Sequence, residues 1–237
     1  RAAMEARVIR STGSFASVLT NDGILLSCRL KGILRTRDLR TTNPVAVGDL
    51  VLLEQVGNEY LICEVLEREN YIIRRSVNLS AQAHIIAANI DQAALIATIH
   101  SPRTSAGFVD RFLITCAAYH IPAFIVFNKT DLLEENDETL LYFREVYEAA
   151  GYPVLDVSAA TDRNIEILRT KLNGCTTLFA GHSGAGKSSL INRLSPELRL
   201  KTGAISSAHH KGKHTTTFAE MFPLAANTWL IDTPGVK

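Results

Sequence analysis

The sequence is poor in cysteine and has no long apolar run. Its four cysteines are far apart and form neither a CxxC pair nor a cluster with histidines (Cys28, Cys63, Cys116 and Cys175). That spacing argues against a zinc site and fits free thiols in a reducing cytosol. No stretch approaches the roughly 20 apolar residues of a membrane-spanning helix, and residues 1–10 lack the apolar segment of a secretory signal. These absences predict a cytoplasmic protein that contacts no membrane.

Charge is nearly balanced overall but unevenly distributed. The formal net charge is +1; residues 1–75 and 181–237 are net positive, and residues 76–180 are net negative. The most basic stretch, Cys28–Thr41, contains a single acid, Asp38, beside its basic residues Arg29, Lys31, Arg35, Arg37 and Arg40. It falls between two predicted strands, where a loop could present it to a polyanion such as RNA.

Residues 1–75 have the pattern of a small all-β domain. Turn signals, such as Asn21-Asp22-Gly23 and Gly57-Asn58, separate short runs that alternate in polarity. Five short strands without a helix fit a small barrel; an OB-fold is the best-known example, and an SH3-like barrel fits equally well. The predicted strands are Glu5–Thr12, Ser14–Thr20, Ile24–Arg29, Asp49–Gln55 and Glu59–Leu66.

Residues 93–237 follow a different pattern, after a connector over residues 76–92 whose signals are weak. Apolar runs alternate with helical stretches, which predicts an α/β domain with a mostly parallel sheet covered on both faces. The predicted helices are Gly107–Tyr119, Glu138–Ala150, Asn164–Leu172 and Lys187–Leu194. The predicted strands are Ala93–Ile99, Ala123–Asn128, Pro153–Ser158, Thr176–Ala180, Phe218–Leu224 and Trp229–Asp232.

A phosphate-binding loop is predicted between the strand Thr176–Ala180 and the helix that starts at Lys187. Residues 181–188 fit the pattern GxxxxGK[ST] in the strand–loop–helix context that this motif requires. Its glycines let backbone N–H groups wrap phosphates at a helix N-terminus. Lys187 would reach the β and γ phosphates, and Ser188 would bind Mg²⁺. The predicted contacts are Gly181, Ser183, Gly184, Ala185, Gly186, Lys187, Ser188 and Ser189.

A second motif, Asn128-Lys129-Thr130-Asp131, selects the base. It follows an apolar strand, so it would lie at the strand ends where such sheets bind ligands. The Asp131 carboxylate can accept hydrogen bonds from N1–H and the 2-amino group of guanine. Adenine offers neither donor and would leave that carboxylate unpaired, which makes the discrimination strong. Lys129 would pack its stem along the base, and Asn128 would tie this loop to the phosphate loop.

Weaker motifs complete the predicted nucleotide site. Ser158 and Ala159 would contact the guanine carbonyl through a backbone N–H. In Asp232-Thr233-Pro234-Gly235, Asp232 would lie near the Mg²⁺ water shell and Gly235 would bind the γ phosphate. One of three successive threonines should bind Mg²⁺ and sense the γ phosphate, as in a switch segment; the candidates are Thr215, Thr216 and Thr217. Together these motifs predict a GTP- and GDP-binding protein that uses Mg²⁺.

The order of the motifs is circularly permuted. In ordinary GTPases the phosphate loop comes first and the base motif follows, whereas in this chain the base motif comes first. With the all-β domain in front, the chain resembles the RsgA (YjeQ/YloQ) family of bacterial small-subunit assembly GTPases over essentially its whole length. The resemblance rests on Asn128–Asp131, Gly181–Ser188, Gly212–Thr217 and Asp232–Gly235, with support from Asn89–Gln92 and Val109–Arg111.

The resemblance implies a biological role and additional parts. It implies an OB-fold that contacts 16S rRNA, a GTPase acting in late maturation of the 30S subunit, and a zinc-binding C-terminal domain that does not occur in this sequence. A monomer is expected. It also points to His214 as the catalytic residue, because Val236 follows Gly235 where many GTPases have a water-orienting glutamine. Turnover is therefore expected to be slow alone and stimulated by the small subunit.

Two other interpretations compete with this one. A nucleotide-gated protein–protein module would use the same motifs, and it would touch no RNA; the basic stretch would then be a solvated loop. A P-loop kinase is disfavoured, because the base motif is present and the sequence has no obvious acceptor site. Salt-dependent RNA binding would separate the GTPase that binds RNA from the protein–protein module.

Overall fold

The structure, a computed structural model, describes residues 3–32, 44–75, 83–197 and 218–233. Its contacts divide the chain into two compact units. The first comprises the chain up to Ile90 together with Phe218–Phe222 and Ile231–Thr233, and the second comprises the remainder from Asp91 onward. No helix of the described residues is both long enough and apolar enough to cross a membrane.

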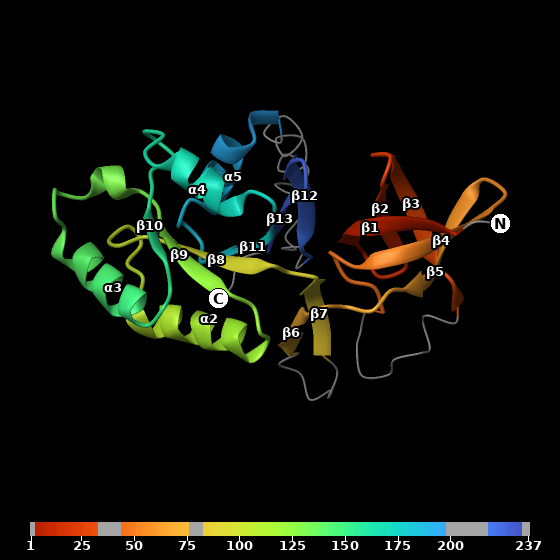
Figure 1. Ribbon diagram of the computed structural model, residues 1–237, viewed down its shortest axis with the longest axis horizontal. Coiled ribbons are helices and arrows are strands. Elements are labelled where there is room, and N and C mark those ends of the chain that lie inside the picture. Colours follow the sequence, from red (N-terminus) through yellow and green to blue (C-terminus); the bar gives the residue numbers. More distant parts are fainter. Residues whose placement is uncertain (1–2, 33–43, 76–82, 198–217, 234–237) are drawn as a thin grey trace. The chain divides into compact units, whose positions relative to one another are not determined.

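The N-terminal strands close into an OB-like barrel in the order β1-β2-β3-β5-β4 (Figure 1). Strand β5 pairs in parallel with β3, whereas the other pairings are antiparallel. An SH3-like barrel has only antiparallel pairs, so this parallel pair favours the OB-like alternative. The strands are β1 (Met4–Ser11), β2 (Phe15–Thr20), β3 (Leu25–Leu30), β4 (Leu50–Val56) and β5 (Glu59–Val65).

Alternation along these strands builds the barrel core. In β2, Ala16, Val18 and Thr20 are buried, while Phe15, Ser17 and Leu19 lie on the outer face. The same period of two in the other strands places small and β-branched side chains inside. The core consists of Ala6, Val8, Ala16, Val18, Cys28, Leu30, Val45, Val51, Leu53 and Ile62. The alternation that predicted the strands is therefore also the pattern that fills the barrel.

A hairpin that the sequence did not predict follows the barrel. Strand β6 (Tyr71–Arg75) pairs with β7 (Ala83–Ala88) in antiparallel fashion, with a register shift at Ile72 and Ile73. Strand β7 lies inside the stretch interpreted as a connector. The hairpin buries only a few small or aliphatic side chains, among them Ile72 and Ile85, which explains its weak signal.

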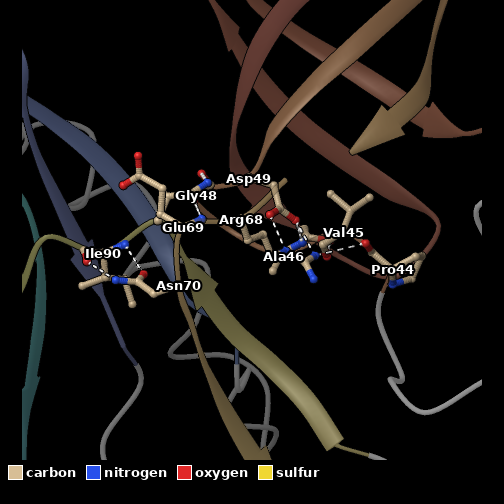
Figure 2. A network of polar contacts seen from close by, with 11 residues as sticks. Pro44, Val45, Ala46, Gly48, Asp49, Arg68, Glu69, Asn70 and Ile90 are labelled. Carbon is tan, nitrogen blue, oxygen red and sulfur yellow. Dashed lines mark hydrogen bonds and ion pairs between the residues drawn. The ribbon is translucent and has the colours of Figure 1, made fainter. Parts of the chain in front are cut away.

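A buried ion pair stabilises the turn between the barrel and this hairpin (Figure 2). The guanidinium of Arg68 donates from Nε and Nη2 to the two carboxylate oxygens of Asp49, each at 2.7 Å. Asp49 is fully buried, and it also accepts the backbone N–H of Ala46 at 2.8 Å. Because a buried charge is tolerated only when it is paired and hydrogen-bonded, Arg68 is required by the position of Asp49.

The tetrapeptide Asn89–Gln92 has a structural role. The Asn89 side chain donates to the carbonyl of Gly48 at 2.9 Å, and Ile90 exchanges two hydrogen bonds with the side chain of Asn70 (Figure 2). In the second unit, the carboxylate of Asp91 accepts the N–H of Thr176 at 2.7 Å. Asn89, Ile90 and Asp91 therefore fix the chain on both sides of the point where one unit ends and the next begins.

Strands β8 to β11 of the second unit belong to a six-stranded sheet in the order β10-β9-β8-β11-β13-β12. Strands β10, β9, β8 and β11 pair in parallel. Strands β8, β9 and β11 are buried along their whole length, as expected for a parallel sheet covered on both faces. The strands are β8 (Gln92–Ala97), β9 (Ala123–Phe127), β10 (Val154–Asp156), β11 (Thr176–Gly181), β12 (Glu220–Ala225) and β13 (Thr228–Asp232).

Among the described residues, four α-helices flank this sheet within a residue or two of their predicted bounds: α2 (Ala106–Ala118), α3 (Glu138–Ala149), α4 (Ile165–Leu172) and α5 (Lys187–Leu194). Helices α2 and α3 lie along one face, and α4 and α5 lie along the other (Figure 1). Ser105 and Asp137 cap α2 and α3 by accepting backbone N–H groups. Tyr147 of α3 donates to Asp110 of α2 at 2.7 Å; burial, with Asp110 beside it, raises the pKa of Tyr147.

The four cysteines are free, as their spacing predicted. Cys28 lies in the barrel core, and Cys116 lies on the buried face of α2. Burial raises the pKa of Cys28 to about 11 and that of Cys116 to about 12. Both therefore remain protonated, unreactive thiols at neutral pH.

Candidate nucleotide-binding site

The predicted phosphate loop connects β11 to α5. Strand β11 ends at Gly181, and α5 begins at Lys187 after a short turn. Gly184 and Gly186 have φ angles of 87° and 83°, which side chains other than glycine rarely adopt. A Cβ at Gly181 would lie 2.5 Å from the carbonyl oxygen of Ile96. The three glycines are therefore needed for the loop itself.

The N-terminus of α5 presents polar side chains beside this loop. Ser188 and Ser189 are exposed and Lys187 is half-buried, all three in the first turn of the helix. The dipole of a helix favours negative charge at this end, and its first backbone N–H groups lack partners within the helix. The local structure is thus that of an anion-binding helix terminus.

Asn128 connects three loops that are far apart in sequence. It follows β9, is buried, and donates from Nδ2 to the carbonyl of Ala185 in the phosphate loop at 3.1 Å. Its Oδ1 accepts the backbone N–H of Ala159 at 3.1 Å. The contact between Asn128 and the phosphate loop that the sequence predicted is therefore present.

Lys129 lies directly over the phosphate loop. It adopts a left-handed conformation with φ of 60°. Its ammonium group donates to the carbonyl of Gly184 at 2.7 Å and to that of Ser101 at 3.1 Å. These two bonds hold the aliphatic stem in one place, which suits the predicted packing of that stem along a planar base.

Asp131 is exposed and is oriented by a buried serine. Ser158 Oγ donates to Asp131 Oδ1 at 2.7 Å and accepts the N–H of Thr161 at 3.1 Å. Thr130, between the two predicted base contacts, donates through its hydroxyl to the carbonyl of Val157 at 2.8 Å. The loops after β9 and β10 are thereby held together, and the Asp131 carboxylate faces solvent with a fixed orientation.

The backbone N–H groups of Ser158 and Ala159 both have partners inside the protein. Their N–H groups are hydrogen-bonded inside the protein, to the carbonyl of Arg163 and to Asn128 Oδ1. In this structure the pair supports Asp131 and Asn128, and a backbone contact to a guanine carbonyl stays a prediction. Arg193 of α5 braces the same loop by donating to the carbonyl of Ala159 at 2.7 Å.

A fourth loop, which the sequence did not predict as part of the site, leads from β8 to α2. Thr104 Oγ1 lies 2.9 Å from Nε2 of His182 in the phosphate loop, and the ring of Phe108 meets the His182 ring edge-on at 5.2 Å. Pro102 lies beside Gly184. No sequence motif marks this loop as part of the site. The one sequence signal for the contact was His182, a polar residue at the second position of the phosphate loop.

The other predicted site residues lie in β13, in the barrel or outside the described residues. Asp232 is the last residue of β13, the strand next to β11 in the sheet, and is half-buried. Arg29 and Lys31 form long ion pairs with Glu59 and Glu54, at 3.9 Å and 3.7 Å. The predicted sites at Arg35, Arg37, Arg40, His214, Thr215, Thr216, Thr217 and Gly235 lie outside the described residues.

The donors present fit a magnesium ion that is bound mainly by nucleotide. Within the described ranges, no group of three or more histidines, cysteines or acids could hold a metal. Mg²⁺ in nucleotide enzymes needs no such cage, because it takes one or two protein oxygens and completes its shell with phosphates and water. The hydroxyl of Ser188 is a donor of that kind.

Comparison with known proteins points in the same direction as this geometry. Residues 5–60 match the family described as RsgA N-terminal domain, and residues 65–237 match the family described as RsgA GTPase. Proteins of Bacteroides fragilis and Christiangramia forsetii named small ribosomal subunit biogenesis GTPase RsgA are each 49% identical over 240 residues, 99% of this chain and 76% of theirs.

Solved structures are similar as well. The crystal structure of YjeQ from Thermotoga maritima is 29% identical and superposes with a TM-score of 0.74, covering 99% of this chain and 75% of that one. The structure of YloQ, described as a circularly permuted GTPase, is 28% identical with a TM-score of 0.69, covering 99% and 72%.

Proposed function

Because this chain belongs to the RsgA family of GTPases, we propose that it couples hydrolysis of GTP to GDP and phosphate to late maturation of the 30S ribosomal subunit. The chain is a GTPase with an OB-like barrel in front of a permuted nucleotide-binding domain. Its relatives are named for biogenesis of the small ribosomal subunit, which supports the same partner for this chain.

The observation that carries the nucleotide assignment is the position of Asn128. One buried side chain bonds the phosphate loop at Ala185 and the loop after β10 at Ala159. Permutation leaves this arrangement intact, because the loops meet at the same edge of the sheet whatever their order in the chain.

Each predicted residue then has a defined task. The N–H groups of the loop from Gly181 to Gly186 and the N-terminus of α5 bind phosphates, and Lys187 neutralises the β and γ phosphates. Asp131, oriented by Ser158, accepts the N1–H and 2-amino donors of guanine. Ser188 and one of the threonines Thr215, Thr216 and Thr217 would hold Mg²⁺, with Asp232 near its water shell; the ion supplies positive charge beside the phosphates when bound.

Hydrolysis requires a group that orients water. Val236, which follows the Asp232–Gly235 motif, cannot do so. We assign the task to His214, which precedes the three threonines; its imidazole can accept a proton from water or orient it. If a partner is needed to complete the site, the free protein should turn over slowly.

The partner is the 30S subunit, and the barrel supplies contacts to its 16S rRNA. The basic residues assigned to RNA are Arg29, Lys31, Arg35, Arg37 and Arg40. We place the protein in the cytoplasm, as a monomer without membrane contact, because ribosome assembly in bacteria occurs there. A zinc-binding C-terminal domain, typical of the family, is proposed for the whole protein and not for these residues.

Steady-state GTP hydrolysis with and without purified 30S subunits tests this function. We expect slow release of phosphate by the protein alone, a rise of at least tenfold with 30S subunits, and no rise with 50S subunits. Lys187→Ala, which removes the phosphate-binding ammonium, should abolish turnover in both conditions. Equal rates with 30S, 50S and no ribosomal particle would refute the coupling and leave a nucleotide-gated protein–protein module as the better description.

A further inference from the structure

The outer face of strands β2 and β3 presents an unusual combination of side chains. Three cross-strand pairs lie on it: Phe15 opposite Arg29, Ser17 opposite Ser27, and Leu19 opposite Leu25. Alternation places their neighbours Ala16, Val18 and Cys28 in the barrel core, so these six side chains form the solvent side of the sheet. We refer to Phe15, Ser17, Leu19, Leu25, Ser27 and Arg29 as the β2–β3 strip.

One end of the strip combines an exposed ring with a cation. Phe15 is 45% exposed, a large fraction for an aromatic residue in a strand. The guanidinium carbon of Arg29 lies 5.3 Å from the centre of that ring, within the range of a cation–π contact. The ion pair of Arg29 with Glu59 is long, at 3.9 Å, so the guanidinium retains donors that can reach a phosphate.

The remainder of the strip is polar in the middle and apolar at the far end. Ser17 and Ser27 offer small hydroxyl groups, and Leu25 is 62% exposed. On the neighbouring strand β1, Arg7 lies opposite Leu19, so a second cation flanks this end. The arrangement is therefore a row of ring, hydroxyls and aliphatic groups with an arginine at each end.

We propose that the β2–β3 strip is a stacking platform for an unpaired RNA base, with Phe15 as the ring and Arg29 as the contact to an adjacent phosphate. The proposal rests on the RNA-binding role of the barrel proposed above, and it adds the chemical form of the RNA. Proteins bind single-stranded nucleic acid through aromatic side chains, on which the bases stack, and through cationic side chains along the phosphate backbone. In OB-folds the face of strands 2 and 3 is a common position for oligonucleotides.

Two features favour an unpaired base over the alternatives. Duplex RNA buries its bases and is recognised mainly through phosphates and 2′-hydroxyls. An exposed phenyl ring cannot donate hydrogen bonds to these groups. A protein partner would bury more apolar area than one phenylalanine and two leucines separated by serines provide. The flanking arginines instead complement a polyanion.

Binding of two fluorescent RNAs to the whole chain tests the proposal: a 12-nucleotide single strand and a hairpin duplex without unpaired bases. Phe15→Ala and Phe15→Leu should weaken binding of the single strand by roughly tenfold, in line with the loss of one stacked base. Phe15→Tyr keeps a ring and should bind like the wild type. Tyr142→Ala removes a ring that is 60% exposed on α3 and serves as the matched control.

Salt dependence separates stacking from charge. The Phe15 variants should keep the wild-type slope of log affinity against log salt. Replacing Arg35, Arg37 and Arg40 together by alanine should flatten that slope by about 0.7 for each lost phosphate contact. Circular dichroism of the Phe15 variants establishes that the barrel is folded, as expected for an outward-facing side chain.

The proposal fails if Phe15→Leu binds the single strand as tightly as the wild type, if single strand and duplex lose affinity equally, or if the wild type binds neither RNA. If the strip instead binds a protein, Phe15→Leu should keep its affinity for RNA and bind 30S subunits more weakly. These failures are distinct from failure of the proposed function, which would appear as wild-type turnover that 30S subunits do not stimulate.

Discussion

Single residues in the nucleotide site hold the loops together as well as presenting groups to a ligand. Asn128 uses its carboxamide oxygen and nitrogen on two different loops, and Ser158 orients Asp131 while it accepts the N–H of Thr161. Removing either side chain would therefore disturb loop positions as well as contacts. A clean test of a residue's role needs a substitution that spares these bonds.

His214→Ala is such a substitution for the hydrolytic step. If its imidazole orients or deprotonates water, the variant should bind GTP nearly normally. Turnover stimulated by 30S subunits should fall at least tenfold, about 1.4 kcal/mol of barrier. His210→Ala replaces a histidine of the same segment that has no proposed catalytic role. It is the matched control and should keep the stimulated rate. Full stimulated turnover in His214→Ala would assign catalysis to the ribosomal partner or to another switch residue.

The sequence was enough to predict the residues of this site whose chemistry is local. Glycines with positive φ, a lysine at a helix start and a carboxylate after a strand are recognisable from residue type and spacing. Contacts made through the backbone were not predictable in this way. Whether the N–H of Ala159 faces guanine or Asn128 depends on how two loops meet, and residue type carries no signal for it. The contact of Thr104 with His182 was missed for the same reason.

At the scale of elements, the buried pair of Asp49 and Arg68 should be sensitive to the loss of either partner. We expect Arg68→Ala to lower the free energy of unfolding of the first unit by about 3–5 kcal/mol, because it leaves an unpaired carboxylate in a fully buried position. Chemical denaturation followed by circular dichroism measures the change, with the two units treated as separate transitions.

Arg163→Ala is the control for this prediction. Arg163 pairs with Asp156 at 3.2 Å, but its side chain is 56% exposed against 20% for Arg68. A surface ion pair contributes about 0–1 kcal/mol, so this variant should unfold almost as the wild type does. Equal effects of the two substitutions would mean that the Asp49–Arg68 pair is not what stabilises the turn.

Elements were predictable in proportion to the apolar surface that they bury. Strands such as β8 and β11 and the helices around them carry strong periodic patterns, and their bounds agree with prediction to within about two residues. The hairpin of β6 and β7 buries little and has a register shift, so its alternation is interrupted and no strand was predicted there. The choice between OB-like and SH3-like barrels depended on one long-range parallel pair, β3 with β5, which no local pattern encodes.

For the molecule as a whole, circular permutation changes the connections and leaves the nucleotide site in place. Strand β9, which leads into the base motif, precedes strand β11, which leads into the phosphate loop. In the sheet, both strands pair with β8. The motif order could be identified from the sequence because each motif is short and continuous. The chain spans 76% of the length of its Bacteroides fragilis relative, and the motifs of the nucleotide site all lie within that shared part.

The central claim is that the separated motifs form one guanine-nucleotide site, and competition binding of Asp131→Asn tests it most directly. An amide at this position can still accept the hydroxyl of Ser158, so the loop should stay in place. Its N–H₂ group would repel the donors of guanine and pair with the C2 oxygen of xanthine. We predict that the wild type prefers GTP over both ATP and xanthosine triphosphate, and that Asp131→Asn prefers xanthosine triphosphate. An unchanged preference for GTP in the variant would contradict the claim.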